Sequence, residues 1–202
     1  LGDVGCFSFY ANKIITTGEG GMVVTNNEEV AERAKLLRDQ AFDKKKRFWH
    51  EQVGYNYRMT NLQAAVGLAQ IEKIDKFVDA RRQNAYLYNS LLRDEIGITL
   101  PPEEKWAKNV YWMYSILIES SFGINRDELM KTLLENYDVE TRSFFYPAHV
   151  QPAYAKGYRK EKYPVAEELS RKGINLPSSN SLQKEEIEYI VDCIISTKKC
   201  SS

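Results

Sequence analysis

A glycine-rich segment between two short apolar runs constrains the fold of this chain more than any other feature. The runs cover residues 6–10 and 21–25, and the segment Thr16-Thr17-Gly18-Glu19-Gly20-Gly21 lies between them. Short apolar or β-branched runs that are bounded by glycine favour strands. We therefore expect two strands joined by a glycine-rich connection, and the apolar character of residues 6–10 predicts that the first strand is buried.

Helical patterns follow these two strands. Asn27 is predicted to cap a helix over residues 28–39, since acidic residues come directly after it. Thr60 and Gln63 form a capping-box pattern, and from there apolar residues recur at helical spacing to the early nineties. The residues that keep this spacing are Val66, Ala69, Ile74, Phe77, Val78, Arg81, Ala85, Tyr88 and Leu92. One long helix, straight or kinked, is expected to bridge two lobes.

After Leu100-Pro101-Pro102 the pattern changes to alternating strands and helices. Strands are expected over residues 110–118 and 138–142. The expected helices run from an Asn125 cap to about residue 136, over residues 164–172 up to Gly173, and from a Ser181 cap onward. This pattern predicts a second, α+β lobe, and the expected domains are residues 1–93 and 94–202.

Composition excludes several classes of protein. Lys+Arg and Asp+Glu both number 28, so a net charge of zero gives no general attraction to nucleic acid or to an acidic membrane. No apolar run approaches the roughly 20 residues that span a bilayer. We expect a protein that binds neither nucleic acid nor membrane, with a cytoplasmic location.

Cysteine and histidine are too few and too scattered for a metal site. Cys6, Cys193 and Cys200 form no C-x-x-C pair, and the chain has only two histidines. This favours reduced thiols, with neither a zinc site nor a disulfide framework. The first residue is Leu, and a strand pattern begins within ten residues, so we expect that further sequence precedes this chain in the natural protein.

Lys13 is the strongest candidate for chemistry. It is predicted to lie at the end of a buried strand, beside Ile14 and Ile15 and ahead of a glycine turn. Desolvation in such a place lowers the pKa of an amine, as a lysine that forms a Schiff base requires. The alternative is a lysine that extends from the strand end into solvent.

The segment S-F-x-x-x-K-x-x-T-T-G-E-G-G, from Ser8 to Gly21, resembles the cofactor-lysine segment of the DegT/DnrJ/EryC1/StrS sugar aminotransferases, which are fold-type I pyridoxal-phosphate (PLP) enzymes. The resemblance implies an α/β fold: the end of the large-domain sheet followed by a small α+β domain. By the same resemblance Lys13 holds PLP and moves the proton during transamination. Ser8 matches the serine that helps to hold the cofactor phosphate.

A second segment, Gly54-Tyr55-Asn56-Tyr57-Arg58 with Gln63-Ala64-Ala65 downstream, is similar to the family pattern G-Y-N-x-R-x-x-x-x-Q-A-A. In the family this asparagine reaches across a dimer interface to the partner's cofactor phosphate. Asn56 therefore implies a homodimer with shared sites. Arg58 either binds the same anionic region or forms an ion pair on the surface.

Two segments in the second lobe point to the substrate. Phe145-Tyr146-Pro147-Ala148-His149 and the residues up to Tyr154 are similar to the family pattern F-Y-P-x-H-x-x-P-x-Y. His149 and Arg142 are therefore candidates for binding the sugar and its diphosphate, although a lone histidine is more often a hydrogen-bonded loop residue. Residues 109–114 resemble the perosamine-synthase branch, which aminates GDP-4-keto-6-deoxymannose.

The basic run at residues 44–47 has two open interpretations. With the neighbouring Phe48 and Trp49 it could bind a nucleotide diphosphate. Charge runs are more often solvated loops.

The resemblance predicts a PLP-dependent aminotransferase that moves an amino group from glutamate to a nucleotide-linked 4-keto-6-deoxy sugar. It covers only the latter half of the family's usual length, without the aspartate that pairs with the pyridine nitrogen, so the chain alone is expected to be inactive. One alternative is a noncatalytic fragment or a module for nucleotide-sugar binding and dimerisation. A lesser alternative is a PLP-dependent sugar dehydratase, in which histidine replaces the lysine. A dinucleotide-binding dehydrogenase is disfavoured, because Gly18-Glu19-Gly20-Gly21 does not form G-x-G-x-x-G.

Overall fold

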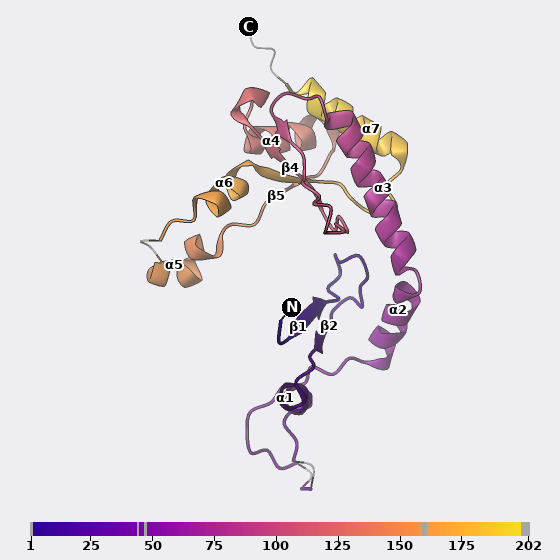
Figure 1. Cartoon of the computed structure of the whole chain (residues 1–202), viewed down its shortest axis with the longest axis vertical. Coiled ribbons are helices and arrows are strands. Elements are labelled where there is room, and N and C mark those ends of the chain that lie inside the picture. The colour runs from indigo at the N-terminus through magenta and orange to yellow at the C-terminus, as the bar shows by residue number, and fades with distance from the viewer. Residues whose placement is uncertain (1, 44, 47, 159–160, 199–202) are drawn as a thin grey trace. The chain divides into compact units, whose positions relative to one another are not determined.

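The computed structural model describes residues 2–43, 45–46, 48–158 and 161–198. By its internal contacts the chain divides into two compact units, Leu1–Lys76 and Phe77–Ser202. Figure 1 shows the order of the elements along the chain. None of the described helices has both the length and the hydropathy required to cross a membrane.

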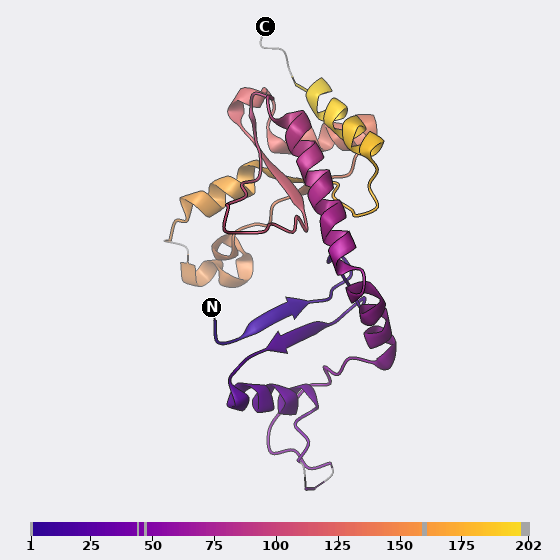
Figure 2. The same ribbon diagram turned by 45° about the vertical axis from the view of Figure 1, so that its right-hand side comes forward.

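The first unit contains the two strands that the sequence predicts. β1 (Gly5–Ser8) and β2 (Gly21–Val24) pair antiparallel, with Ser8 opposite Gly21 (Figure 2). The expected burial of the first strand is wrong. Side chains alternate between the faces of a strand, yet Phe7 is 57% exposed and β2 is exposed along its whole length. The described part of this unit therefore covers neither face of the pair.

Helix α1 (Glu28–Arg38) follows β2 and begins where the sequence predicts. The Asn27 side chain accepts a hydrogen bond from the backbone N–H of Val30 at 3.1 Å. Glu28 and Glu29 lie in the first turn, where negative charge favours the helix N-terminus. The predicted cap is confirmed.

The predicted long helix is divided into α2 (Asn61–Ile71) and α3 (Ile74–Leu92). The capping box is confirmed, since Thr60 Oγ1 accepts from the Gln63 backbone N–H and the Gln63 side chain accepts from the Thr60 backbone N–H. At the break, the Lys73 N–H donates to the carbonyl of Gln70, three residues earlier. This tighter turn ends α2 before α3 begins.

The apolar period of this region is buried in α3 but not in α2. Arg81, Ala85, Tyr88 and Leu92 are buried, as their spacing predicts. In α2 no residue is buried, and Val66 is 47% exposed. The apolar spacing thus predicts the helix in both segments, but in the described part of the chain it coincides with burial only in α3.

The buried residues of α3 also place it in the fold. Ala85, Tyr88 and Leu92 belong to the core of the second unit, and the division falls between Lys76 and Phe77, within α3. The predicted boundary at residue 93 assigned the whole helix to the first domain. The difference arises because a helix belongs to the unit in which its apolar side is buried.

The second unit contains a mixed arrangement of strands and helices. β3 (Ile98–Thr99), β4 (Tyr114–Ile118), β6 (Gly173–Leu176) and β5 (Arg142–Ser143) form an antiparallel sheet in that spatial order. The strand expected over residues 110–118 is confirmed in its second half. The one expected over 138–142 is shorter and shifted to β5, and β6, which lies between β4 and β5, was not predicted.

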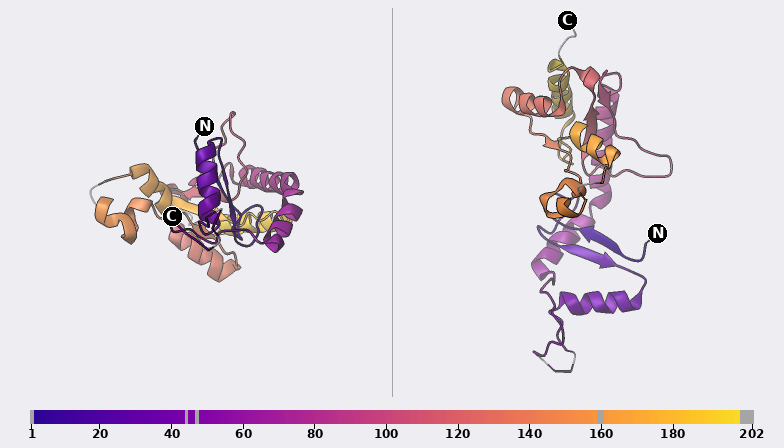
Figure 3. Two further views of the ribbon diagram at one scale, coloured as in Figure 1. Left: turned by 90° about the horizontal axis from the view of Figure 1, so that it is seen from below. Right: turned by 90° about the vertical axis from the view of Figure 1, so that its left-hand side faces the viewer.

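Besides most of α3, this unit contains four further described helices. They are α4 (Arg126–Tyr137), α5 (Pro152–Tyr158), α6 (Pro164–Lys172) and α7 (Lys184–Ser196), with 3-10 turns at Ser120–Phe122 and Ala148–Val150. Figure 3 shows α5 and α6 beside each other. The expected Asn125 cap of α4 is confirmed. The expected Ser181 cap is wrong, because Gln183 caps α7 through Glu186 and the Ser181 hydroxyl bonds to Ser179 instead.

One core holds the second unit together. Tyr88 of α3 stacks on Tyr114 of β4, with ring centroids 4.5 Å apart. Burial of such rings and of aliphatic side chains from the sheet and helices is the main stabilising contribution. The fully buried aliphatic residues are Leu92, Ile116, Leu129, Leu133, Ile174, Ile187 and Ile194.

Candidate active site

The connection between β1 and β2, residues 9–20, is named here the lysine loop. Backbone hydrogen bonds close it at its base: the Phe9 N–H donates to the carbonyl of Gly20 at 2.9 Å, and the Thr17 N–H donates to the carbonyl of Phe9 at 3.0 Å. The Thr16 hydroxyl donates to the same Phe9 carbonyl at 2.9 Å. Residues 10–16 therefore form a closed loop with a fixed base.

Lys13 lies at the centre of this closed loop and is partly buried. Its backbone N–H donates to the carbonyl of Tyr10 at 3.0 Å, which forms a turn. The expectation that Lys13 ends a strand is wrong, because β1 ends at Ser8 and the chain turns before Lys13. The hydrogen bonds at the base of the loop extend the pairing of β1 and β2, whereas Lys13 lies beyond them in the loop itself.

Two glycines are required by the shape of the lysine loop. Gly18 has φ +79° and Gly20 has φ +154°, in the region that side chains disfavour. A Cβ on Gly20 would lie 2.5 Å from Thr17 Oγ1 and 3.1 Å from Met59 Cε. The glycines of the sequence pattern thus allow the close turn that returns the chain to β2.

Helix α2 contacts the lysine loop through two glutamines. The Gln70 Oε1 atom accepts a hydrogen bond from the Thr16 backbone N–H at 2.9 Å. The Gln63 Nε2 atom donates to the Glu19 carbonyl at 3.0 Å. Thr16 and Glu19 both follow Lys13, so α2 fixes the part of the loop that returns from the lysine to β2.

Ser8 ends β1 next to this loop and is exposed. Its Oγ atom accepts from the Tyr10 backbone N–H at 3.3 Å. In that hydrogen bond the hydroxyl is the acceptor, so its own proton is available to donate to an anion. Ser8 thus ends the strand that leads into the lysine loop, five residues before Lys13, and its predicted role toward the cofactor phosphate stays a prediction.

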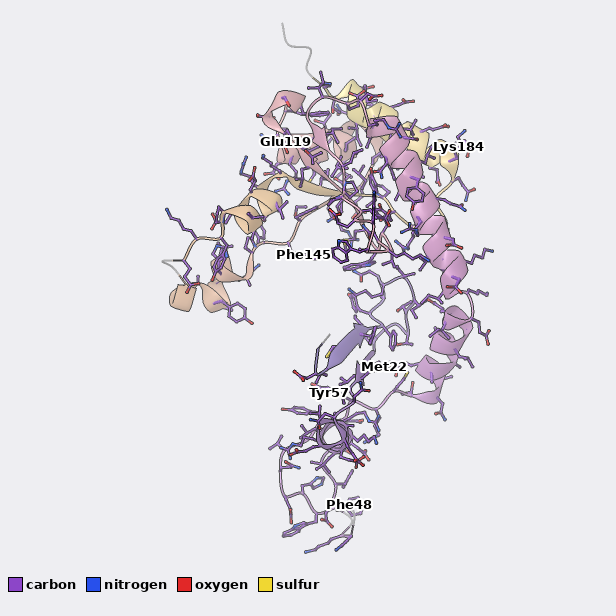
Figure 4. The ribbon with its side chains drawn as sticks, in the orientation of Figure 1. Met22, Phe48, Tyr57, Glu119, Phe145 and Lys184 are labelled. Carbon is purple, nitrogen blue, oxygen red and sulfur yellow. The ribbon has the colours of Figure 1, made fainter. Side chains whose placement is uncertain are left out.

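Asn56 lies in an extended segment beside the end of α1. The Tyr55 N–H donates to the carbonyl of Leu37 at 2.7 Å, and the Tyr57 N–H donates to that of Arg38 at 3.0 Å. The rings of Tyr55 and Tyr57 stack at 5.2 Å, and Figure 4 labels Tyr57 close to α1. Because side chains alternate along extended backbone, the exposed Asn56 side chain points away from both rings.

Arg58 forms an ion pair with Asp39 through Nη1. Both side chains are about half exposed. The structure thus gives Arg58 the surface partner that the alternative interpretation expected, and its role toward an anion stays a prediction.

Arg142 lies in the second unit, on β5 and opposite Asn175 of β6. Its side chain is 66% exposed, with Nη2 4.0 Å from Glu140 Oε1. An exposed guanidinium on an edge strand can bind phosphate oxygens. The predicted role in binding the sugar diphosphate is compatible with this position and stays a prediction.

His149, in the 3-10 turn before α5, has a protein partner. Its Nε2 atom lies 3.0 Å from Glu167 Oε1, and its ring lies 4.8 Å from that of Tyr163. The pKa of Glu167 is lowered, first by a hydrogen bond from the Tyr163 backbone N–H and then by His149. This contact is what the hydrogen-bonded interpretation expected, and the role of His149 in substrate binding stays a prediction.

The aromatic neighbours of the basic run are partly described. Lys44 and Arg47 lie outside the described residues. The Nζ atom of Lys46 lies 3.7 Å from the centre of the Trp49 ring, and Phe48 is 70% exposed. Lys46 thus covers one face of the Trp49 ring, which favours the solvated-loop interpretation over nucleotide binding.

Comparison with known proteins gives the family. The DegT/DnrJ/EryC1/StrS aminotransferase family matches residues 1–195. The chain belongs to this family. It is 43% identical over 200 residues to the GDP-perosamine synthase of Vibrio cholerae, an alignment that covers 99% of this chain and 54% of that protein. The chain thus spans about half the length of the relatives it matches.

Solved structures of the family have the same fold. The Helicobacter pylori aminotransferase PseC, involved in the biosynthesis of pseudoaminic acid, aligns with a TM-score of 0.89 at 28% identity, over 97% of this chain and 53% of that one. DesV of S. venezuelae aligns with a TM-score of 0.87 at 29% identity, over all of this chain and 53% of that one. The predicted α/β fold, the C-terminal part of a fold-type I PLP-dependent transferase, is confirmed.

The contact between α2 and the lysine loop was not predicted from the sequence. From the sequence, Gln63 was assigned to a capping box and to the family pattern, but to no contact with the lysine loop, and Gln70 was given no role. A signal was present, since Gln63, Gly67 and Gln70 have the spacing of one helix face within an otherwise apolar segment. Polar and small residues on one face of an apolar helix indicate a specific contact there.

Proposed function

We propose that the natural protein carrying this sequence is a PLP-dependent aminotransferase that moves an amino group from glutamate to a nucleotide-linked 4-keto-6-deoxy sugar. The observation that carries the proposal is the position of Lys13, partly buried in a loop that backbone hydrogen bonds and glycines close. Nucleophilic amines in enzymes need such a fixed and partly desolvated position.

The residues of the first unit fit PLP in their chemistry. Lys13 supplies an amine for the aldehyde, and Ser8, at the end of the neighbouring strand, supplies a hydroxyl proton for a phosphate oxygen. Gly20 ends the loop and Gly21 begins β2, both without side chains, and a Cβ on Gly20 would clash with Thr17. A lysine, a hydroxyl and a glycine turn on one connection are suited to a compact ligand that carries both an aldehyde and a phosphate.

Each residue then has a distinct role. PLP, when bound, supplies the electron sink that allows amino-group transfer. Lys13 Nζ would hold the cofactor and, once free, accept and return the proton that moves during the reaction. Ser8 would donate to the phosphate. Arg142 and His149 would bind the sugar diphosphate, and Arg58 would contribute positive charge once its pairing with Asp39 is exchanged for phosphate.

Asn56 supports the proposal that the protein is a homodimer with shared sites. Its side chain is exposed and points away from the neighbouring tyrosine rings, on a segment fixed to α1 by backbone hydrogen bonds. An amide presented in this way can donate to a group held by a second subunit. In a twofold dimer the same contact forms twice, so each site would combine Lys13 of one subunit with Asn56 of the other.

The substrate class is proposed from the relatives. Several are GDP-perosamine synthases at 39–43% identity. We propose a GDP-linked 4-keto-6-deoxy sugar as the substrate, polysaccharide biosynthesis as the process and the cytoplasm as the location. Lys13 disfavours the dehydratase alternative, in which a histidine takes this position.

The test is an amino-transfer assay of the natural protein with GDP-4-keto-6-deoxymannose and ¹⁵N-labelled glutamate. We expect a sugar product that carries the label, and we expect Lys13→Arg to lower the rate by roughly 10³-fold or more, because arginine keeps the charge but cannot deprotonate. Loss of water without gain of nitrogen would instead support the dehydratase. Absence of both reactions, with no binding of PLP, would support the noncatalytic alternative.

A further inference from the structure

In helix α2 the partly buried residues are polar or small and the apolar residues are exposed, the reverse of the usual arrangement. Its residues are exposed except for Gln63, Gly67 and Gln70, which are partly buried. These three are spaced four and three residues apart and so lie on one face of the helix. The face that meets the rest of the unit is therefore polar and small, whereas apolar residues such as Leu62 and Leu68 are exposed.

This face lies directly against the lysine loop. Gln70 accepts from the Thr16 backbone N–H at 2.9 Å, and Gln63 donates to the Glu19 carbonyl at 3.0 Å. Between them, a Cβ on Gly67 would lie 2.9 Å from Thr17 Cγ2, so only glycine allows this close approach. Three points of contact hold the returning part of the loop.

The backbone group that each glutamine contacts determines whether its side-chain amide uses its oxygen or its nitrogen. A backbone N–H can only donate, so Gln70 must present its oxygen to Thr16. A backbone carbonyl can only accept, so Gln63 must present its nitrogen to Glu19. The Gln63 oxygen is used as well, because it accepts from the Thr60 backbone N–H at 2.9 Å. The two glutamines thus have opposite chemical requirements on one helix face.

Thr16 links the Gln70 contact to the position of Lys13. The Thr16 backbone N–H donates to Gln70, as described above. The Thr16 hydroxyl donates to the carbonyl of Phe9 at 2.9 Å, and its Oγ1 atom accepts from the Gly18 N–H at 2.8 Å. Phe9 and Thr16 lie at the two ends of the closed part of the loop. A shift of Thr16 would therefore change the path of residues 10–16, which include Lys13.

We propose that Gln63 and Gln70 are positioning residues that set the place of the Lys13 amine by holding the lysine loop from α2. The proposal rests on the proposed function of Lys13. Neither glutamine needs to touch cofactor or substrate. Their effect passes through backbone hydrogen bonds to Thr16 and Glu19.

The opposite requirements give a matched pair of variants. Gln70→Glu keeps an acceptor oxygen for the Thr16 N–H, whereas Gln63→Glu removes the donor and places a carboxylate oxygen against the Glu19 carbonyl. Both changes keep the shape of the side chain and add one negative charge. The two positions are seven residues apart on the same face of α2. Gln70→Met keeps the approximate length and removes the acceptor.

Two measurements on the natural protein test the proposal. The first is deuterium uptake of peptides covering residues 10–20 without PLP, where we expect Gln63→Glu and Gln70→Met to increase exchange roughly five- to tenfold and Gln70→Glu to stay near wild type. The second is steady-state amino transfer. Gln63→Glu and Gln70→Met should lower kcat about tenfold with little change in the sugar KM, whereas Gln70→Glu should keep kcat near the wild-type value.

Equal behaviour of Gln63→Glu and Gln70→Glu in deuterium uptake, or unchanged uptake in Gln70→Met, would overturn the proposal. If Gln70→Met does not fold, the comparison of Gln63→Glu with Gln70→Glu still decides, since both add the same charge to the same helix face and only Gln70→Glu keeps its hydrogen bond to the lysine loop. Failure of the proposed function is distinguishable, because then the wild-type protein itself would not transfer an amino group while the uptake pattern would still follow the glutamines.

Discussion

Lys172, in the last turn of α6, is held by two carboxylates. Its Nζ atom lies 2.6 Å from Glu119 Oε2, and it also binds Glu168 one turn earlier. Glu119 accepts a further hydrogen bond from the Thr99 hydroxyl at 3.2 Å. The hydrogen bond from Lys172 is the main reason why the pKa of Glu119 lies below its ordinary value of 4.5. Figure 4 labels Glu119 in the second unit.

This shift predicts how stability depends on acid. The folded pKa of Glu119 lies below the unfolded one, so its contribution to stability is complete above the unfolded pKa and is lost as pH falls through the folded pKa. We expect Glu119→Gln to flatten part of the fall in unfolding temperature between about pH 5 and about pH 3. Thermal unfolding across this range measures the effect.

Lys172→Met provides the matched control, because it removes the cause of the shift and leaves the carboxylate. It should flatten the same part of the curve, and the double variant should add little further change. Curves for Glu119→Gln and wild type that stay parallel between these pH values would show that the pair does not couple folding to acid.

Among the elements, β3 is joined to the rest of its unit through a glycine that no other residue can replace without strain. Gly97 directly precedes β3 and has φ +90°. A Cβ there would lie 2.3 Å from the Phe122 backbone nitrogen, and Phe122 is fully buried. The Gly97 carbonyl also accepts from the Glu119 N–H at 2.8 Å. This junction therefore cannot move without opening the core.

Gly97→Ala is expected to lower the free energy of unfolding by about 2 kcal/mol or more, since both the left-handed backbone and the clash oppose it. Denaturant unfolding measures this. Gly157→Ala is the control, because no atom lies within 4 Å of the added Cβ, and alanine in a helix is neutral or stabilising. A Gly97→Ala protein as stable as the Gly157→Ala protein would contradict this account of the junction.

The elements that local sequence determines were predictable. The caps at Asn27, Thr60 and Asn125 depend on side chains a few residues away, and the structure confirms each of them. β6 was missed because its pairing with β4 and β5 joins residues far apart in sequence, and four residues are too few for a periodic signal. The burial of β1 was wrong because cover for a strand comes from other segments, which its own residues do not specify.

In the candidate site, too, features set by neighbouring residues could be predicted and contacts between distant segments could not. Ser8 and Lys13 could be found because one continuous pattern carries both. Gln70 lies 54 residues from Thr16, and its role became visible only when α2 was placed against the lysine loop. His149 was predicted from a pattern, but its contact with Glu167 depends on the packing of α6.

At the scale of the whole molecule, the first unit exposes many apolar side chains. Phe7 and Met22 on the strands and Leu62 and Val66 on α2 are each between 47% and 82% exposed. Soluble proteins rarely leave large apolar surfaces exposed without a binding function. Since the chain spans about half the length of its relatives, this surface is compatible with packing against other parts of the natural protein and with the proposed homodimer.

The proposed shared sites predict complementation between two inactive variants. Lys13→Ala and Asn56→Ala subunits, mixed at equal amounts and allowed to exchange, should recover roughly a quarter of wild-type amino transfer, because half of the dimers are mixed and each has one intact site. The separate variants measured under the same conditions are the control. A mixture no more active than the average of the two variants would show that Lys13 and Asn56 serve the same site within one subunit.

Lys13 is the residue that we propose holds PLP, and the proposed function depends on it. The most direct test of this role is reduction of the natural protein with borohydride in the presence of PLP, followed by proteolysis and mass spectrometry of the peptides. We expect the added phosphopyridoxyl mass on the peptide that contains Lys13. A label on a different lysine, or no label in a folded protein with PLP in excess, would contradict the account.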